Sequence, residues 1–405
     1  MSNAPAPVRS DAQGKWDHPL ALLLACALLW LVSPLIVTGT SKTASTEQTT
    51  RLSRPLSGYL DNYRTEPYLS SLLAGTFADG SSIVLFGSSE LATEDHPAKP
   101  VNFFNKRLKQ PLLAIGHDGN QCLSIHSQLI TAGGDLSKAK LAILLSPSWF
   151  GGTPGKRGTE LSCFLEYNPS PSLYRLADRV ANGDSLVRPA QQYLLQHAND
   201  LSTAEPIVKY LVQSGSTLNT AKYSFALPMT RNLMVRAQPT MMLKPQLQMS
   251  SDFSSTATVD VPEWQSLYAD AVYAHLSACT NNDVFINDDF YSTYINGDTR
   301  LLRPLPMEEN REFQDLIALL DYLVAMNADP VFIVQPVNPY VYTDLDAFDP
   351  TIRRIKEELR SRDFAYLDLW AKDTAHFDPG VLTDAAHLGA YGWYRVDSMI
   401  MAHFQ

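Results

Sequence analysis

The sequence predicts an α/β protein in which helices sandwich a central parallel sheet. Three short apolar runs each end in a turn rich in Gly, Ser or Pro; they are Ile83–Phe86, Leu112–Ile115 and Leu141–Leu145. Segments with helical patterns separate these runs, and such alternation is typical of a parallel sheet with right-handed crossovers. Folds of this class carry their chemistry at the carboxyl ends of the strands. The three turns are therefore where a functional site is expected.

The other elements follow from the local spacing of apolar residues. Residues 53–75 are predicted to form a helix before the first strand, and residues 101–109 a helix after it. A helix from Gln121 to about Ala132 should stop at Gly133-Gly134. The pattern of the C-terminal part predicts, in order, helix 309–327, strand Val331–Val334, helix 350–361, strand Ala365–Leu369 and helix Ala390–His403.

Residues 155–300 differ from the segments on either side. Strand signals fade there, and residues 171–199 and 203–214 have helical patterns. We interpret this region as a helical insertion between the third and fourth strands. It is expected to lie over the strand ends and to form a wall of the cleft.

The N-terminal region contains an apolar run. Pro19–Val37 holds nineteen residues without a charge, about the length that crosses the hydrocarbon core of a bilayer. A cleaved signal peptide is the alternative, but the length of the run and the lack of a small-x-small cleavage site favour an uncleaved anchor. The expected organisation is a flank at 1–18, a transmembrane anchor at 19–38, a polar tether at 39–54 and one domain at 55–405. The charges beside the run do not settle its orientation.

Composition limits the function. The 405 residues are 45% hydrophobic, enough for a sizeable core, and the net charge of −10 does not favour nucleic acid as a partner. The four cysteines form no Cys-x-x-Cys pair, which argues against a zinc ribbon or a redox pair. His-x-His, His-Glu-x-x-His and P-loop motifs are absent from the sequence, so metallohydrolases and nucleotide enzymes are not favoured. No metal or cofactor is predicted.

Ser88 and Ser89 follow the first apolar run directly after Gly87. A serine there could act as a nucleophile if a base takes its proton. Asp384 and His387 have a spacing of three, which places both on one face of a turn. The carboxylate could hold the imidazole while its other nitrogen faces Ser89. Each piece alone has an ordinary alternative, an N-capped turn or a surface pair. Their order along an α/β chain favours a catalytic triad.

This order resembles the SGNH (GDSL-like) hydrolase superfamily of flavodoxin-like α/β proteins, in which the first strand ends in Gly-Asp-Ser and a late Asp-x-x-His completes a triad. Ser89 then matches the nucleophile and Ser88 replaces the aspartate. The blocks that narrow the resemblance to the DltD family of teichoic-acid D-alanylation are Phe-Gly-Ser-Ser-Glu-Leu (86–91), Gly116 with Gly119-Asn120-Gln121, Ser-Pro-Ser-Trp-Phe (146–150), Asn281-Asn282, Gln-Pro-Val-Asn (335–338) and Asp-x-x-His-Leu-Gly-x-x-Gly-Trp (384–393). The chain departs from the family at Ser148, where the family has Gln, and at His117-Asp118, where Gln-Gly is expected.

The resemblance implies a membrane-anchored serine acyltransferase or esterase that moves D-alanyl groups to a cell-envelope polymer. Its domain would lie outside the cytoplasm, in the periplasm or the extracellular space, at the end of a single-pass anchor. Its partners would be a membrane-bound O-acyltransferase and an acyl carrier protein. Ser89, Asp384 and His387 would be catalytic, and the N–H groups of Ser89 and Gly119 would form the oxyanion hole.

Two other functions stay open: a non-catalytic recruitment protein of a membrane acylation complex, and an O-acetyl esterase or transferase acting on an exopolysaccharide. The acidic balance of the chain fits poorly with a polyanionic acceptor. The identity of the acceptor therefore also stays open.

Three further residues are candidates for binding substrate: Asn120, Trp149 and Asn338. Trp149 has a core aromatic role as its alternative, and Asn338 the capping of a turn. The acidic stretches at 281–283 and 288–289 miss the EF-hand spacing, so solvated loop carboxylates are favoured over a cation site. Glu90 is interpreted as a first-turn carboxylate that the helix dipole favours.

Overall fold

The computed structural model describes residues 55–63, 69–93, 96–152, 154–156, 158–204, 248–249, 264–280 and 282–404. In these residues the centre of the molecule is a seven-stranded sheet of order β5-β1-β3-β2-β4-β7-β9, in which β5 is antiparallel to β1 and the other pairs are parallel. Its strands are β1 (Leu56–Leu60), β2 (Ile83–Phe86), β3 (Leu112–Ile115), β4 (Lys140–Leu145), β5 (Gln248–Met249), β7 (Val331–Val334) and β9 (Ala365–Asp368). A separate small sheet pairs β6 (Arg300–Leu301) with β8 (Tyr342–Thr343).

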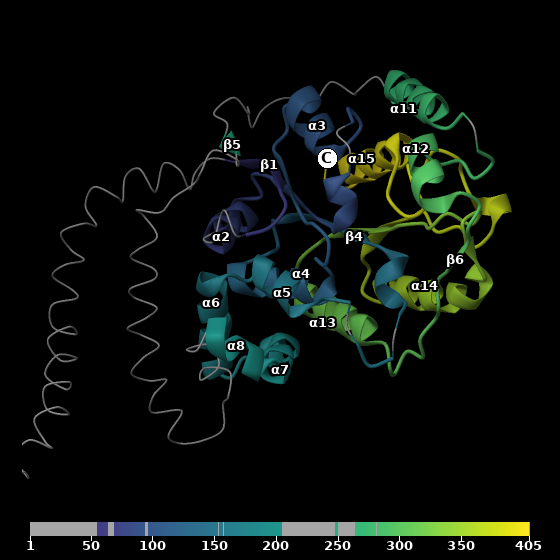
Figure 1. The fold of residues 1–405 in the computed structure, drawn as a ribbon. Helices are drawn as coiled ribbons and strands as arrows, with labels where there is room; N and C mark the ends of the chain where they lie inside the picture. Colours follow the sequence, from purple (N-terminus) through teal and green to yellow (C-terminus); the bar gives the residue numbers. More distant parts are fainter. Residues whose placement is uncertain are drawn as a thin grey trace, which may run out of the picture.

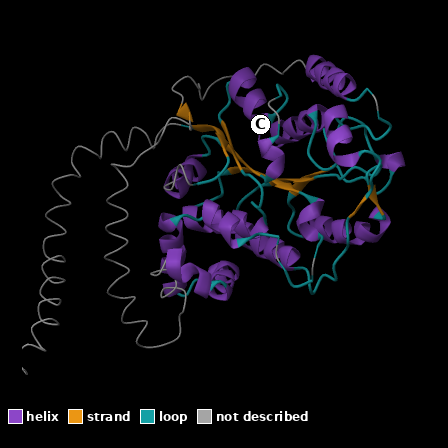
Figure 2. Cartoon of the chain, viewed as in Figure 1, coloured by secondary structure: helices purple, strands orange, loops and turns teal. Residues whose placement is uncertain are grey.

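Helices connect the strands (Figure 2). The described helices are α2 (Leu69–Asp79), α3 (Pro100–Asn102) with the π-helix η2 (Phe103–Leu108), α4 (Cys122–Ala132), α5 (Leu161–Tyr167), α6 (Ser170–Ala181), α7 (Arg188–Gln196), α8 (Ala198–Ala204), α11 (Trp264–Ala278), α12 (Asp288–Phe290) with the π-helix η6 (Tyr291–Ile295), α13 (Arg311–Ala325), α14 (Leu345–Arg360) and α15 (Ala390–Phe404). Short 3₁₀ turns are η1 (Ser89–Ala92), η3 (Pro147–Phe150), η4 (Ser185–Val187) and η7 (Thr374–His376).

The sheet is buried on both faces. Alternate side chains of β2 point to opposite cores: Val84 and Phe86 to one, Ile83 and Leu85 to the other. Helices α2, α4, α13 and α14 cover the first face, and α3, α11 and α15 cover the second (Figure 1). Strands covered on both sides are apolar along their whole length. This is why short continuous apolar runs identified them in the sequence.

The strand order places a topological switch at β2. From β2 the chain adds β3 on one side and then returns to add β4 on the other, so that β3-β2-β4-β7-β9 has the order of a flavodoxin-like sheet. The predicted α/β class with a central parallel sheet is confirmed. The bounds predicted for β2, β3 and β7 are confirmed, and β4 begins one residue earlier than expected.

The helix predicted over residues 53–75 is confirmed at residues 69–75, which belong to α2, but residues 56–60 form strand β1 instead. The structure has strand β1 and then α2, which runs to Asp79. Backbone pairing of β1 with β3 on one side and β5 on the other holds this segment extended. Those partners are distant in sequence, so the local apolar pattern did not reveal them.

The described residues of the insertion are mainly helical, and they lie on both faces of the sheet instead of forming one wall over the strand ends. Helices α5, α6 and α7 pack against α4 on one face of the sheet, and α11 packs against α15 on the other. The predicted helix 171–199 is broken near Gly183 into shorter pieces. Of the predicted helix 203–214, only the first two residues are described, as the end of α8. Among its described residues, the insertion approaches the site at α5, where Cys163 faces Gly119, and at α12 with η6, which line a pocket that includes Asp384.

Within the described part of the chain, no helix has the length and apolar character needed to cross a membrane. The predicted flank at 1–18, anchor at 19–38 and tether at 39–54 lie outside the described residues.

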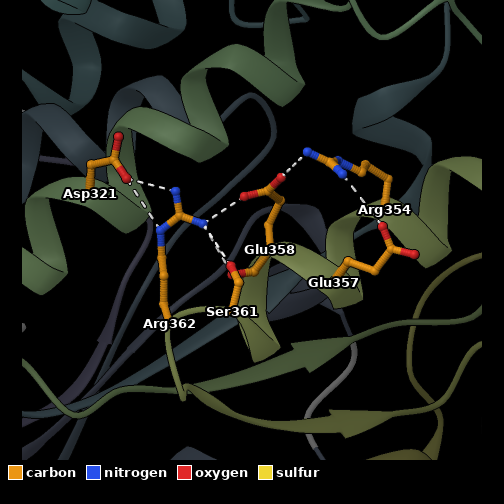
Figure 3. Close-up of polar contacts among 6 residues, drawn as sticks. All are labelled: Asp321, Arg354, Glu357, Glu358, Ser361 and Arg362. Atoms are coloured by element: carbon orange, nitrogen blue, oxygen red, sulfur yellow. Dashed lines mark hydrogen bonds and ion pairs between the residues drawn. The ribbon is translucent and has the colours of Figure 1, made fainter.

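An ion-pair network joins α14 to α13 on the first face of the sheet (Figure 3). Arg362, just after α14, contacts Asp321 of α13 at 2.7 Å and Glu358 at 2.7 Å. Glu358 also pairs with Arg354. Asp321 and Arg354 are exposed, and ion pairs to exposed side chains contribute little to stability. The network lies outside the candidate site.

Candidate active site

The turn after β2 is pressed against the turn after β3. A Cβ atom on Gly116 would lie 2.0 Å from the carbonyl oxygen of Gly87, so only glycine fits at 116. Ser88 Oγ donates a hydrogen bond to the His117 carbonyl at 3.1 Å, and Asn120 Nδ2 donates to the Gly87 carbonyl at 2.9 Å. These contacts fix the backbone that carries Ser89.

Ser89, His387 and Asp384 form a continuous chain of hydrogen bonds. His387 Nε2 lies 2.9 Å from Ser89 Oγ, although the two residues are 298 positions apart in the sequence. His387 Nδ1 lies 2.7 Å from Asp384 Oδ2. Asp384 Oδ1 accepts the backbone N–H groups of Ala386 and His387, both at 2.8 Å. With the proton on Nδ1, Nε2 is free to accept the Ser89 proton, which is the arrangement of nucleophile, base and orienting carboxylate.

The charges around the imidazole make it a stronger base. Burial lowers the pKa of His387, but the Asp384 hydrogen bond and charge, with the charges of Glu90 and Asp118, raise it above its ordinary value overall. Burial raises the pKa of Asp384, but the bonds from His387 and from two backbone N–H groups lower it overall. The His387 side chain is 32% exposed, so a substrate can reach it.

The two backbone N–H groups predicted as oxyanion donors belong to the turns after β2 and β3. Ser89 is the first residue of η1, so its N–H has no acceptor within that turn. Gly119 has φ of +81°, and a Cβ atom there would lie 2.7 Å from Cys163 Sγ of α5. Helix α5 therefore requires a bare backbone at this position of the β3 turn.

Glu90 is closer to the site than the sequence suggested. It does belong to the first turn of η1, but it is buried, and its Oε1 accepts the Ser88 N–H at 2.8 Å. Burial raises the pKa of Glu90, while its hydrogen bonds and the nearby His387 lower it in part. The sequence signal that could have found it is a carboxylate able to reach back to the start of a turn, as in a capping box.

Asn120 and Trp149 are expected from the sequence to contact substrate, and both are buried in the structure. Asn120 is fully buried, and its Oδ1 accepts a hydrogen bond from Gln128 Nε2 at 2.7 Å while its Nδ2 holds the Gly87 carbonyl. Trp149 is buried in the core. Asn120 therefore supports the turn that carries Ser89, and Trp149 has the core aromatic role that the sequence offered as its alternative.

Asn338, for which the sequence offered substrate binding or the capping of a turn, is also fully buried. Its N–H donates to the Ala385 carbonyl at 2.9 Å, and its Nδ2 donates to the Val284 carbonyl at 2.7 Å. Its Oδ1 accepts the Tyr340 N–H at 2.8 Å, which caps the turn after β7. Asn338 therefore positions the Asp384–His387 loop from behind.

The glycines of the 384–393 block let α15 approach this loop closely. A Cβ atom on Gly392 would lie 2.3 Å from the Val381 carbonyl oxygen. Within the loop, the Thr383 N–H donates to the His387 carbonyl at 2.9 Å. The loop is thus closed on itself and held against the start of the helix.

The acidic loop near Asp288 is satisfied internally. Asp288 Oδ2 accepts the Thr280 hydroxyl at 2.6 Å, and its Oδ1 accepts Asn282 Nδ2 at 2.6 Å. Among the described residues, no group of three or more His, Cys, Asp or Glu side chains is arranged to hold a metal ion. Asn281 lies outside those residues.

The fold and the site together define an α/β protein with a Ser–His–Asp arrangement at the topological switch point of its sheet. Residues 70–405 match the family model described as "DltD protein", and the chain belongs to the DltD family. It is 23% identical to Protein DltD of Staphylococcus aureus (strain NCTC 8325 / PS 47) over 328 residues, which cover 79% of this chain and 80% of that protein. It is 24% identical to Protein DltD of Bacillus subtilis (strain 168) over 351 residues, which cover 80% and 82%.

The family resemblance predicted from the sequence blocks is therefore confirmed. Membership of the DltD family implies involvement in the D-alanylation of teichoic acid.

Proposed function

We propose that this chain is a serine acyltransferase, with esterase activity toward water, that passes D-alanyl groups to a cell-envelope polymer through an ester on Ser89. The observation that carries the proposal is the hydrogen-bond chain of 2.9 and 2.7 Å that joins Ser89, His387 and Asp384. A protein that only recruits partners has no need of an imidazole aligned in this way. That the transferred group is D-alanyl is inferred from membership of the DltD family.

The first half-reaction loads the serine. Ser89 Oγ attacks the carbonyl carbon of the D-alanyl donor as His387 Nε2 takes the hydroxyl proton. The N–H groups of Ser89 and Gly119 stabilise the negative charge that forms on the carbonyl oxygen. The bond to the leaving group then breaks, His387 returns the proton to that group, and D-alanyl-Ser89 remains.

The second half-reaction reverses these roles. A hydroxyl group of the polymer attacks the ester carbonyl as His387 takes its proton. The bond to Ser89 Oγ breaks, and Ser89 recovers the proton from His387. Water in place of the polymer would give hydrolysis by the same steps, which is why transferase and esterase activities share one site. Asp384 holds the imidazole and stabilises its charged form in both halves.

The setting of the reaction rests on the family resemblance. The domain would work outside the cytoplasm, tethered by residues 19–38. A carrier protein and a membrane-bound O-acyltransferase would supply the D-alanyl group from the other side. DltD proteins are associated with the cell envelope, which agrees with this setting.

The test is covalent capture. Purified protein is treated with a serine-reactive fluorophosphonate, or with a D-alanyl ester followed by an acid quench, and the modified residue is identified by mass spectrometry. We expect modification of Ser89, none in Ser89→Ala, and retention in Ser88→Ala, the neighbouring hydroxyl. Equal modification of Ser89→Ala would refute the proposal. The same reaction is also measured with acetyl esters. A preference for D-alanyl esters over acetyl esters would distinguish D-alanyl transfer from the alternative of an exopolysaccharide O-acetyl esterase or transferase.

A further inference from the structure

A pocket of about 370 Å³ lies beside the triad. This volume is within the range of small-molecule sites, about 300–1,000 Å³. Its walls come from the end of η1, from α12 and η6, from the triad loop and from the start of α15, with the residues Thr93, Asn287, Asp289, Phe290, Thr293, Tyr294, Thr383, Asp384, Leu388, Gly389, Ala390 and Trp393. Only Asp384 of these belongs to the triad.

The lining disfavours an anionic ligand. It contains no Lys, Arg or His among the described residues, and it does contain the carboxylates of Asp289 and Asp384. The guanidinium of Arg300 lies 6.0 Å from the Phe290 ring but does not line the pocket. A phosphate would meet negative charge here with no cation to offset it. The pocket is therefore unsuited to a phosphate group.

Aromatic rings and hydrogen-bonding groups stand side by side in the pocket. The Tyr294 side chain is 65% exposed, and its ring lies 5.0 Å from that of Phe290. Asn287 Oδ1 accepts the N–H groups of Asp289 and Phe290, which fixes the orientation of its amide. Exposed rings offer a face to C–H groups, and carboxylate, amide and hydroxyl groups pair with ligand hydroxyls. Sugars and other polyols present both kinds of surface.

The position of the pocket suits the acceptor polymer better than the alanyl group. Ser89 and His387 do not line it, so the pocket begins on the Asp384 side of the triad. An alanyl group bound to Ser89 is only a few bonds long and stays near His387 Nε2. The acceptor polymer, in contrast, extends away from its reacting hydroxyl. A unit next to that hydroxyl can occupy the pocket.

We propose that this pocket binds an uncharged sugar or polyol unit of the acceptor, with the rings of Tyr294 and Phe290 against its C–H face and Asp289 and Asn287 on its hydroxyl groups. This inference rests on the proposed function. The Asn287 N–H donates to the Thr383 carbonyl at 2.8 Å, so the pocket wall is bonded directly to the triad loop. An occupied pocket would therefore hold the acceptor at a fixed position relative to His387.

Binding is measured in Ser89→Ala, which cannot be acylated, with glycerol, glucose and maltotriose as neutral probes and poly(glycerol phosphate) as the polyanion. Ligand-observed NMR and calorimetry give the affinities. We expect a neutral probe to bind and Tyr294→Ala or Asp289→Asn to weaken it by about ten-fold. The matched control is Tyr273→Ala, because Tyr273 is 74% exposed on α11 and does not line the pocket. It should leave the affinity unchanged.

The proposal is overturned if no neutral probe binds, if the polyanion alone binds, or if Tyr273→Ala weakens binding as much as Tyr294→Ala. In protein with Ser89 intact, Tyr294→Ala should raise KM for the polymer acceptor more than it lowers kcat. The two proposals fail separately. Absence of Ser89 acylation with intact sugar binding removes the proposed function and leaves a sugar site, whereas acylation without sugar binding removes only the pocket assignment.

Discussion

The chain contains two Asp-x-x-His segments with nearly the same local geometry. In Asp373–His376 the histidine Nδ1 lies 2.6 Å from the carboxylate, and in Asp384–His387 it lies 2.7 Å away. In both, the aspartate also accepts the backbone N–H of the histidine, at 3.1 and 2.8 Å. The side chains of the first pair are 66% and 41% exposed, and those of the second 32% and 12%.

The difference between the pairs lies in what surrounds the imidazole. His387 Nε2 meets Ser89, and the carboxylates of Asp384, Glu90 and Asp118 raise its pKa. His376 lies on η7 at the surface, outside both sheet cores. The local motif therefore supplies an oriented imidazole, and the fold decides whether that imidazole has a nucleophile to activate. Asp373–His376 is a built-in control for every test of the site.

The largest expected effect is the loss of the base. His387→Ala should lower the rate of Ser89 acylation by about 10⁴- to 10⁶-fold, because His387 is the base that lies against Ser89 Oγ in the described part of the chain. The measurement is single-turnover acylation with a D-alanyl ester. His376→Ala should leave the rate unchanged. A similar loss in both variants would mean that the two pairs are equivalent and that the triad assignment is wrong.

The second-largest effect is expected from removing the negative charge of Asp384, which orients the imidazole. Asp384→Asn is expected to lower the rate by about 10⁴-fold, since the amide favours the wrong imidazole tautomer and no longer stabilises the charged ring. Asp373→Asn makes the same exchange at the exposed pair and should have no effect on acylation. Circular dichroism of both variants checks that the fold is kept. Full activity of Asp384→Asn would contradict the role assigned to the carboxylate.

The pH dependence should separate the pairs further. The base must be neutral to accept a proton, and the pKa of His387 is raised. The acid limb of kcat/KM should therefore fall at a pH above the ordinary imidazole value of about 6.5. Asp384→Asn should move the residual activity's limb to lower pH, whereas Asp373→Asn should leave the limb in place. A wild-type limb below the ordinary value would argue against His387 as the base.

Substitution of Glu90 should have a smaller effect on activity, through the pKa of His387. Glu90→Gln removes a charge that raises the pKa of His387 but keeps an acceptor for the Ser88 N–H. We expect the acid limb to move to lower pH and the plateau rate to stay within about ten-fold. Glu90→Ala also loses the acceptor, and should lower the free energy of unfolding by about 1–3 kcal/mol. An unmoved limb in Glu90→Gln would show that Glu90 acts on the backbone alone.

Asp397 is a buried carboxylate that, unlike Asp384, has no histidine bonded to it among the described residues. It lies on α15, fully buried, with neither carboxylate oxygen hydrogen-bonded within the described residues, and burial raises its pKa. The folded state holds the proton that the unfolded state releases above its ordinary pKa, so stability falls as the pH rises past that value. Asp397→Asn should therefore raise the free energy of unfolding at neutral pH by about 1–3 kcal/mol and leave acylation unchanged. Chemical denaturation measures it, and a loss of stability would contradict the assignment.

Strands buried on both faces were predictable because their whole length is apolar. Ile83–Phe86, Leu112–Ile115 and Val331–Val334 have the predicted bounds. β1 was not predictable in this way, because two of its five residues, Gly58 and Tyr59, are only partly buried and its pairing partners are distant in sequence. Only the tertiary structure, in which β1 pairs with β3 and β5, identifies this segment as a strand.

For the site, residue types and order along the chain were enough to bring Ser89, His387 and Asp384 together. The sequence could not distinguish Asp384–His387 from Asp373–His376 by spacing, since the two are the same. It offered the capping of a turn for Asn338, but it did not indicate that the Asn120 amide is hydrogen-bonded inside the protein. A buried hydrogen bond depends on which backbone groups lie opposite, and that is a property of the tertiary structure.

The separation of 298 residues between Ser89 and its base has a consequence for biosynthesis. The ribosome completes the nucleophile turn and most of the sheet long before it reaches the loop that carries His387. A chain released early would hold a serine with no base to activate it. In the proposed reaction, Ser89 therefore gains its base only when the last loop, which carries His387, docks between the β7 turn and the start of α15.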